Sequence, residues 1–371
     1  MTSDRRGYLA TRRTRRVAGD RRLTRRTVLP WAVAVVAGAV AGWLLAVLGV
    51  PSPTLFAGLV GGCIVALWLE NPPQIGRLTT RASQAVIGTT IGATITLPAL
   101  QRLATGWAAA VAVTAATLAL SIGCGFLLSR IGRIGRLTGV LSMIAGGAST
   151  LTAITRELGG DDRVVAVVQY LRVLLILVTL PAIALWFFHA HAGPTTSAPH
   201  TRLWSDLLYT ALCVGIGALI GWLIPISTFF LLGPMIVSAV LAISGVLGAV
   251  RVPEPVVAVC FVALGLQVGL RFTRASLRAI ARLLPAAAVM ILLVVIGSGA
   301  LGWVLEQATG IDPLTAYLAT TPGGLPAVLA IATDSNADAT YVFAVQMARL
   351  LLVLITAPLL SRLIGRERST D

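Results

Sequence analysis

Long apolar stretches, separated by short joints rich in Pro and Gly, fill most of the chain. A helix that crosses a bilayer needs about 20 apolar residues, because the hydrocarbon core is about 30 Å thick. The pattern therefore predicts an all-α polytopic membrane protein. The candidate segments are 29–50, 54–69, 82–100, 106–128, 137–155 and 164–189 in the first half, and 205–224, 228–248, 255–270, 283–305, 313–333 and 339–361 in the second.

The sequence contains an internal repeat. Residues 137–181 align with residues 314–358 at a constant offset of 177, without a gap. Apolar composition alone would match Leu and Val by chance, but it would not match polar residues, Gly and Pro in one register. The matched pairs include Thr138/Thr315, Gly146/Gly323, Gly147/Gly324, Asp161/Asp338, Gln169/Gln346, Arg172/Arg349 and Pro181/Pro358.

The repeat predicts the domain organisation. Membrane repeat 1 is expected at 29–189 and membrane repeat 2 at 205–363, joined by a polar linker at 190–204. A basic, disordered cytoplasmic tail is expected at 1–28, and a short polar tail at 364–371.

The distribution of Arg bears on topology, because cytoplasmic loops of membrane proteins carry an excess of positive charge. If every segment crossed, the cluster at 271–282 would face outside. If instead the Gly-Gly segments at 137–155 and 313–333 enter the membrane and return to the same side, this cluster and both termini face the cytoplasm. We therefore expect two inverted repeats of about five spans each, plus one re-entrant or broken segment per repeat, as in many secondary transporters.

Composition supports a membrane protein. Of the 371 residues, 57% are hydrophobic and 12% are charged, whereas soluble proteins carry about 25% charged residues. The net charge is +15, and the basic residues, all Arg, are concentrated in residues 5–26. We expect this tail to contact anionic lipid and no specific nucleic acid. Its Arg25-Arg26 pair also resembles a twin-arginine export signal, but the many later spans and the repeat favour a cytoplasmic basic flank that holds the first span in place.

The residues that hold metals or perform catalysis are sparse. The four Cys lie in apolar runs without CxxC spacing, which is typical of small core residues. The three His are His189, His191 and His200, without a nearby Cys or carboxylate cluster. We find no P-loop, no G-x-S-x-G motif and no dinucleotide fingerprint. The sequence therefore predicts no metal, no cofactor and no enzymatic activity.

Two arginines are the strongest site candidates. Arg172 and Arg349 each lie eight to ten residues inside an apolar span, a depth of about 12–15 Å. A charge there is costly and needs a partner. Gln169 and Gln346 precede them by three residues on the same helix face. One hypothesis is that these side chains bind an anionic substrate group. The other is that each Arg caps carbonyls of the adjacent Gly-Gly segment or pairs with Asp161 or Asp338.

The Gly-Gly segments are the second part of the candidate site. Broken backbone inside a membrane is tolerated where it is buried in protein or lines a cavity. Asp161 and Asp338 precede long helices, so we expect them to be N-caps, with coupling to an ion or proton as the alternative. The candidate substrate-binding residues are Gly146, Gly147, Ser149, Gln169, Arg172, Pro322, Gly323, Gly324, Gln346 and Arg349.

The doubled Gly-Gly segment, followed by Gln-x-x-Arg and Thr-x-Pro, resembles the AbrB family of bacterial integral membrane proteins. The best local matches are 321–325 and 345–349, and the resemblance covers about 30–365. The first copy has Ala145 and Ala148 where the second has Pro322 and Leu325. Family members often carry the labels ammonia monooxygenase and regulator of gene expression. The first would need metal ligands that are missing here, and the second would need a DNA-reading domain.

The sequence favours a secondary-transporter-like permease for a small solute, with an anion as the class suggested by the two arginines. A membrane sensor or regulator that affects gene expression indirectly is the alternative, and a monooxygenase subunit is a weaker one. We expect a multi-pass protein of the inner (plasma) membrane with cytoplasmic termini. Its Gly-rich faces would allow a homodimer.

Overall fold

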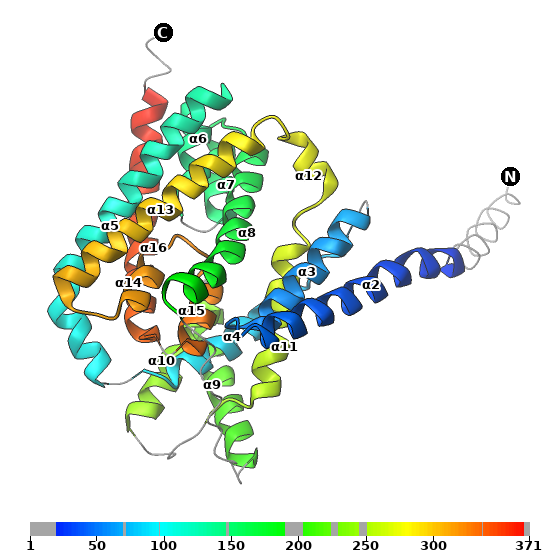
Figure 1. Cartoon of the computed structure of the whole chain (residues 1–371), viewed down its shortest axis with the longest axis vertical. Coiled ribbons are helices and arrows are strands. Elements are labelled where there is room, and N and C mark those ends of the chain that lie inside the picture. The colour runs from blue at the N-terminus through cyan, green and yellow to red at the C-terminus, as the bar shows by residue number, and fades with distance from the viewer. Residues whose placement is uncertain are drawn as a thin grey trace, which may run out of the picture.

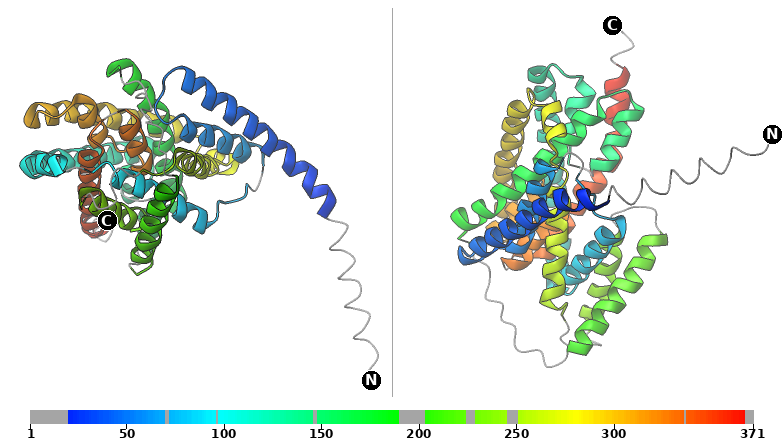
Figure 2. Two further views of the ribbon diagram at one scale, coloured as in Figure 1. Left: turned by 90° about the horizontal axis from the view of Figure 1, so that it is seen from below. Right: turned by 90° about the vertical axis from the view of Figure 1, so that its right-hand side faces the viewer.

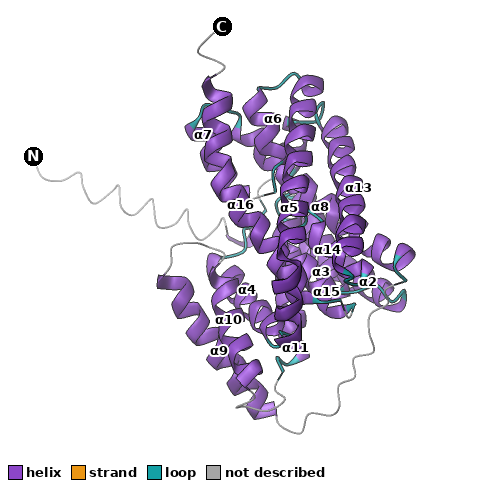
Figure 3. Ribbon diagram, turned by 90° about the vertical axis from the view of Figure 1, so that its left-hand side faces the viewer, coloured by secondary structure: helices purple, strands orange, loops and turns teal. Residues whose placement is uncertain are grey.

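The computed structural model describes residues 20–69, 72–95, 97–145, 148–189, 203–223, 229–244, 251–335 and 337–366. Every regular element in these ranges is an α-helix (Figure 3). The helices are α2 (Asp20–Val47), α3 (Pro53–Trp68), α4 (Arg77–Gly92), α5 (Leu97–Gly132), α6 (Arg136–Met143), α7 (Ala148–Glu157), α8 (Asp162–Phe187), α9 (Leu203–Leu223), α10 (Phe229–Ser244), α11 (Glu254–Gly269), α12 (Arg274–Ala279), α13 (Leu284–Thr309), α14 (Pro313–Thr320), α15 (Leu325–Asp334) and α16 (Ala339–Arg366).

Five helices in the described ranges are long and apolar enough to cross a membrane, namely parts of α2 and α5 together with α8, α9 and α13. Shorter apolar helices, among them α3, α10 and α11, pack around them. The expectation of an all-helical, multi-pass membrane protein is therefore confirmed.

The helices form two groups that pack mainly within themselves. The first group consists of α2, α3, α4, α9, α10 and α11. The second consists of α5 to α8 and α13 to α16. Figure 1 shows the second group at the upper left, whereas α9 and α10 lie at the lower end and α2 extends to the right. Figure 2 shows α9 and α10 side by side.

Glycines bring the backbones of the first group into direct contact. A Cβ atom on Gly88 of α4 would lie 2.1 Å from the carbonyl oxygen of Leu231 on α10. A Cβ atom on Gly265 of α11 would lie 2.0 Å from the carbonyl oxygen of Leu55 on α3. Only Gly fits at such distances. Gly88 and Gly265 therefore allow close helix packing, and the two crossings, α4 with α10 and α11 with α3, each join one half of the chain to the other.

The second group is built around two long helices and two broken segments. Helices α5 and α13 pack together and run in opposite directions (Figure 1). The predicted segment 137–155 consists of α6 and α7, and 313–333 consists of α14 and α15. In the second segment Pro326 occupies the first turn of α15, where its missing N–H costs no helical hydrogen bond.

One side-chain hydrogen bond joins the two ends of each broken segment. Asp161 N–H donates to Thr138 Oγ1 at 3.1 Å, so the start of α8 lies beside the start of α6. Asp338 N–H donates to Thr315 Oγ1 at 2.9 Å, so the start of α16 lies beside the start of α14. Both bonds link residues 23 positions apart, and they therefore close equivalent loops.

Two predicted boundaries differ from the structure. The segment 82–100 is divided between α4 and α5, because α4 ends at Gly92 and α5 begins at Leu97. Pro98 in the first turn of α5 is the signal for this start. Helix α2 begins at Asp20, so residues 20–28 of the expected disordered tail are helical, because Arg is a good helix former. Residues 1–19 and most of the linker 190–204 lie outside the described residues.

We predict that Gly88→Val destabilises the protein by at least about 1–3 kcal/mol, the usual cost of overpacking, because its side chain would displace α10. The thermal unfolding midpoint of the purified protein in detergent measures this. Gly123→Val in α5 is the matched control, since a Cβ atom there has nothing within 4 Å. Equal midpoints for the two variants would contradict the close crossing of α4 and α10.

Candidate functional site

Gln169 and Arg172 of α8 bind the end of α6. Gln169 Nε2 donates to the carbonyl oxygens of Leu141 at 2.9 Å and Ile144 at 2.8 Å. Arg172 Nη1 donates to the Met143 carbonyl at 3.2 Å, and its Nη2 donates to Gln169 Oε1 at 2.8 Å. The two side chains therefore act as one unit at the point where α6 stops.

Gln346 and Arg349 of α16 bind the end of α14 in the same way. Gln346 Nε2 donates to the carbonyl oxygens of Leu318 at 3.0 Å and Thr321 at 2.9 Å. Arg349 Nη1 donates to the Thr321 carbonyl at 3.0 Å, and its Nη2 donates to Gln346 Oε1. The capping of broken-segment carbonyls, one of the two hypotheses from the sequence, is confirmed at both sites.

The chemical reason for this arrangement is the end of a helix inside the protein. The last four carbonyl groups of an α-helix have no intrahelical partner, and no water is present in the bilayer core to bind them. Gln and Arg are spaced three residues apart, so they project from one face of a helix. The amide and guanidinium donors of this face supply the missing partners.

The capping bonds leave part of each guanidinium unused. Arg172 is 5% exposed and Arg349 is 7% exposed. The Nε atoms of both are buried without a hydrogen-bond partner. In the described ranges neither Arg forms an ion pair with a carboxylate, including Asp161 and Asp338. Arg172 acts on Arg349 as a like charge. Two buried positive charges thus share one region without a negative partner.

The second broken segment is interrupted between α14 and α15, at residues 321–324. This interruption, the second break, lies against α8, the helix that carries Arg172. A Cβ atom on Gly323 would lie 3.2 Å from Cγ2 of Ile176, and one on Gly324 would lie 3.8 Å from Cγ1 of Val173. Both of these side chains belong to α8, within one turn of Arg172. Pro322, the preceding residue, is buried. The structure therefore places Gly323 and Gly324 against α8, the helix of Arg172, while Gln346 and Arg349 bind Thr321 at the start of the same break.

The first break, between α6 and α7 at residues 144–147, is only partly described. Gly146 and Gly147 lie outside the described residues, as does the side chain of Ser149. Asp161 is the N-cap of α8, because its Oδ1 accepts the N–H groups of Arg163 and Val164 at 3.0 and 3.1 Å. Asp338 Oδ1 accepts the N–H of Tyr341 at 3.0 Å. The predicted capping role of both Asp residues is confirmed.

A cleft of about 760 Å³ lies away from the arginines, between the start of α5, the end of α13 and the starts of α14 and α16. Sequence reasoning assigned no role to Asp312, which lines the cleft and caps α14 through a bond from Thr315 N–H at 3.1 Å. The Asp312-Pro313 pair is a helix-start signal that would have identified it. The cleft is also lined by Thr105, Gly106, Ala108, Ala109, Ala308, Thr309, Gly310, Ile311, Thr315, Ala337 and Asp338.

The chain is similar to known proteins over nearly its whole length. Residues 55–365 match the family model AbrB, described as transition state regulatory protein AbrB. The chain is 31% identical over 344 residues to a protein of Escherichia coli (strain K12) named "Putative regulator AbrB", covering 91% of this chain and 97% of that one. It is 23% identical over 364 residues to "Uncharacterized protein YhjN" of Bacillus subtilis (strain 168), covering 90% and 92%.

We predict that Gln346→Leu and Gln169→Leu each lower stability, because each leaves two buried carbonyls without a donor. An unpaired buried group costs about 1–3 kcal/mol. Thermal unfolding in detergent checks this, with Gln307→Leu on the exposed face of α13 as the control. The capping assignment is wrong if Gln346→Leu unfolds at the same temperature as the control.

Proposed function

The chain belongs to the AbrB family of multi-pass membrane proteins, and we propose that it is a secondary-transporter-like permease for a small anionic solute. The observation that carries this proposal is the pair of buried guanidinium groups, Arg172 and Arg349, each with an unpartnered Nε. A buried charge is costly without a counter-charge, and a guanidinium is effectively always charged. A small anion would supply that charge.

The proposal includes two inverted repeats. The hydrogen bonds of Gln169 and Arg172 reappear at Gln346 and Arg349, at the same offset of 177 as the repeat in the sequence. Helix α5 and its sequence counterpart α13 run in opposite directions. A shared local geometry with opposite chain direction is typical of inverted repeats in transporters.

The proposal also includes two re-entrant segments. Helices α14 and α15 have 8 and 10 residues, so they reach about 12 and 15 Å, too short for a single span each. The Thr315–Asp338 bond holds the start of α14 beside the start of α16. Asp338 follows Asp334, the last residue of α15, by only four positions. This supports a segment that enters, breaks at 321–324 and returns to the same end. The Thr138–Asp161 bond supports the same path for α6 and α7.

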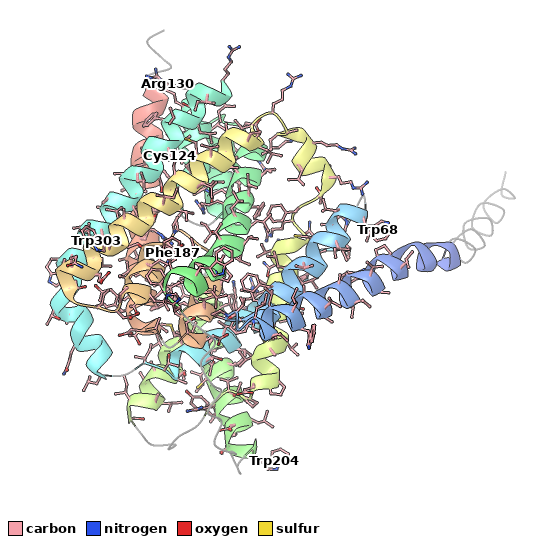
Figure 4. All side chains as sticks on the ribbon, in the orientation of Figure 1. Trp68, Cys124, Arg130, Phe187, Trp204 and Trp303 are labelled. Carbon is pink, nitrogen blue, oxygen red and sulfur yellow. The ribbon has the colours of Figure 1, made fainter. Side chains whose placement is uncertain are left out.

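Charge supports a cytoplasmic C-terminus. The α5–α6 turn, the α12–α13 turn and the C-terminal end of α16 lie at the upper end of the molecule in Figure 1. Arg130 is labelled at this end in Figure 4, and α12 contributes Arg274 and Arg278. The α13–α14 turn, with Asp312, lies away from it at the lower left. The positive-inside rule therefore favours a cytoplasmic upper end, and we propose an inner (plasma) membrane as the location.

The proposed mechanism uses the unpaired half of each arginine. An anion accepts hydrogen bonds from Nε of Arg172 and Arg349, each worth roughly 1.5–3 kcal/mol when charge-assisted. The same guanidinium groups hold the Met143 and Thr321 carbonyls, so loading the site is coupled to the ends of both broken segments. Movement of one helix group against the other then exposes the site to either side in turn. No bond is made or broken, so the proposed function is not enzymatic.

A membrane sensor or regulator remains the second candidate, because the E. coli relative is named a regulator. The same anion site would then signal without flux. The basic residues 1–19, which lie outside the described residues, are the candidate partner-binding segment, for a cytoplasmic protein or for anionic lipid. Flux through liposomes separates this candidate from the permease.

We predict that phosphate or a small carboxylate, such as acetate or citrate, raises the thermal midpoint of the purified protein. Arg172→Gln and Arg349→Gln should each abolish the shift, because each removes one Nε donor and one charge. Arg278→Gln, on exposed α12, should retain it. An anion that stabilises both Gln variants as well as the wild type would exclude this site, and a confirmed ligand that shows no flux in liposomes would favour the sensor.

A further inference from the structure

The cleft at the α13–α14 turn has two carboxylate groups in its wall, those of Asp312 and Asp338. Thr315 holds the two residues together. Its N–H donates to Asp312 Oδ2 at 3.1 Å, and its Oγ1 accepts the N–H of Asp338 at 2.9 Å. None of the described residues that line the cleft is Arg or His. Two negative charges therefore face the cleft without a basic partner in its described wall.

Helix capping uses only one oxygen of each carboxylate. Asp312 Oδ2 caps α14 through Thr315, and Asp338 Oδ1 accepts the N–H of Tyr341 at 3.0 Å at the start of α16. These bonds leave Asp312 Oδ1 and Asp338 Oδ2 available to a ligand. Capping therefore explains the positions of the two acids but does not neutralise their charge.

A buried phenol oxygen lies at the wall of the same cleft. Tyr341 is 0% exposed, and its Oη is buried without a hydrogen-bond partner. A Cβ atom on Gly106 would lie 3.4 Å from this oxygen and 3.2 Å from Cγ2 of Thr309, and both Gly106 and Thr309 line the cleft. The Thr309 hydroxyl donates to the Leu305 carbonyl at 2.6 Å, so its proton is not available to Tyr341. A buried oxygen without a partner is costly, and a ligand in the cleft would supply one.

The C-terminal end of α13 adds backbone oxygens. The helix ends at Thr309, and Gly310 is its C-cap in the left-handed conformation, with a φ of 67°. Ala308, Thr309 and Gly310 all line the cleft. The last carbonyl groups of a helix lack intrahelical partners and form the negative end of the helix dipole. The end of α13 therefore favours a positive charge in the cleft, as the two carboxylates do.

Comparison of the repeats separates capping from binding. The hydrogen bond that closes the second broken segment has a counterpart in the first. The residues 177 positions before Asp312 and Tyr341, however, are Gly135 and Val164. Helix α6 begins after Gly135 without a side-chain cap, so a broken segment can be closed without either group. Asp312 and Tyr341 are thus additions of the second repeat, and a binding role accounts for both.

We propose that this cleft binds sodium and that sodium is the coupling ion of the permease, an inference that rests on the proposed function. The ligands are the free oxygens of Asp312 and Asp338, Tyr341 Oη and carbonyl groups at the end of α13. Hard cations prefer such oxygen ligands, and carbonyls at helix ends coordinate sodium in transporters. Among the described residues no third acidic, His or Cys side chain joins the two acids, which favours a singly charged ion over a divalent one.

The sodium site and the arginine site lie at opposite ends of α14. Asp312 caps the start of α14, whereas Arg349 binds the Thr321 carbonyl just after its end. Asp338 and Arg349 are 11 positions apart in the sequence, a distance of about 16 Å along a helix. A cation that ties the start of α14 to the start of α16 stabilises the broken segment on which the anion site depends. In the proposed orientation the cleft faces away from the cytoplasm.

The test is the thermal midpoint of the full-length protein in detergent, titrated with sodium chloride at fixed pH while choline chloride keeps the ionic strength and the chloride concentration constant. We expect a saturable rise, because a ligand that binds only the folded state stabilises it by mass action. Asp312→Asn retains a good capping side chain but loses a charged ligand, so it should raise the apparent dissociation constant for sodium at least about tenfold. Tyr341→Phe should raise it several-fold. Glu306→Gln, an acid of α13 that does not line the cleft, is the control and should respond as the wild type.

A midpoint that does not depend on sodium overturns the proposal, as does the wild-type response in both Asp312→Asn and Tyr341→Phe. A response to choline or calcium in place of sodium also overturns it. The side chain of Arg102, in the turn before Gly106, lies outside the described residues. A sodium response that appears only in Arg102→Gln would identify that residue as the partner of the acids and would reject the site.

The titration requires neither the anion nor flux, so its failure is distinguishable from failure of the permease proposal. Sodium binding that persists while no anion acts would establish the cation site and leave the permease rejected. Where both ligands act, coupling is reciprocal, so sodium should lower the anion concentration that gives half of the thermal shift. An anion affinity that is the same in sodium and in choline would overturn the coupling role.

Discussion

Two helices stop inside the protein, and their last carbonyl groups need hydrogen-bond donors. The rest of the structure depends on how these donors are supplied. Helices α6 and α14 end at Met143 and Thr320, where water is excluded and an unpaired carbonyl is expensive. A Gln–Arg pair on the following long helix solves this at both places with the same bonds. Without these donors, neither break would be stable, and the chain would have no discontinuity at which to form a site.

Capping by arginine also places buried positive charge at both breaks, and the proposed function rests on this charge. Arginine can satisfy several carbonyl and amide acceptors at once, but it brings a permanent charge into the interior. Two such charges lie near each other, and each retains a donor after capping. A purely structural cap would have been served by neutral donors. The use of Arg in both halves is therefore the physical basis for expecting an anionic ligand.

The glycine crossings and a hydrogen bond between Ser52, just before α3, and Asp334 of α15 determine how the two helix groups meet. Backbone contact at Gly88 and Gly265 holds the first group together across the two halves, whereas α15 joins it through the Ser52–Asp334 bond. Helix α15 also packs against α4 of the first group, so the second broken segment lies directly at the boundary between the two groups.

The sequence by itself determined the class of the protein, its membership of a family and the residues at its breaks. The lengths of the apolar segments predict the membrane spans. The repeat offset of 177 residues aligns Gln, Arg and Asp in both halves, so the sequence alone identifies the spans and these residues. Two matters were decided only by tertiary structure. Gln169 and Arg172 had two possible roles, and the position of the α6 carbonyls decided that they cap. The Ser52–Asp334 pair had no sequence signal, because residues 282 positions apart meet only when the helices pack. Periodicity reports which face of a helix is apolar, whereas a hydrogen bond between distant segments depends on where those helices finally lie.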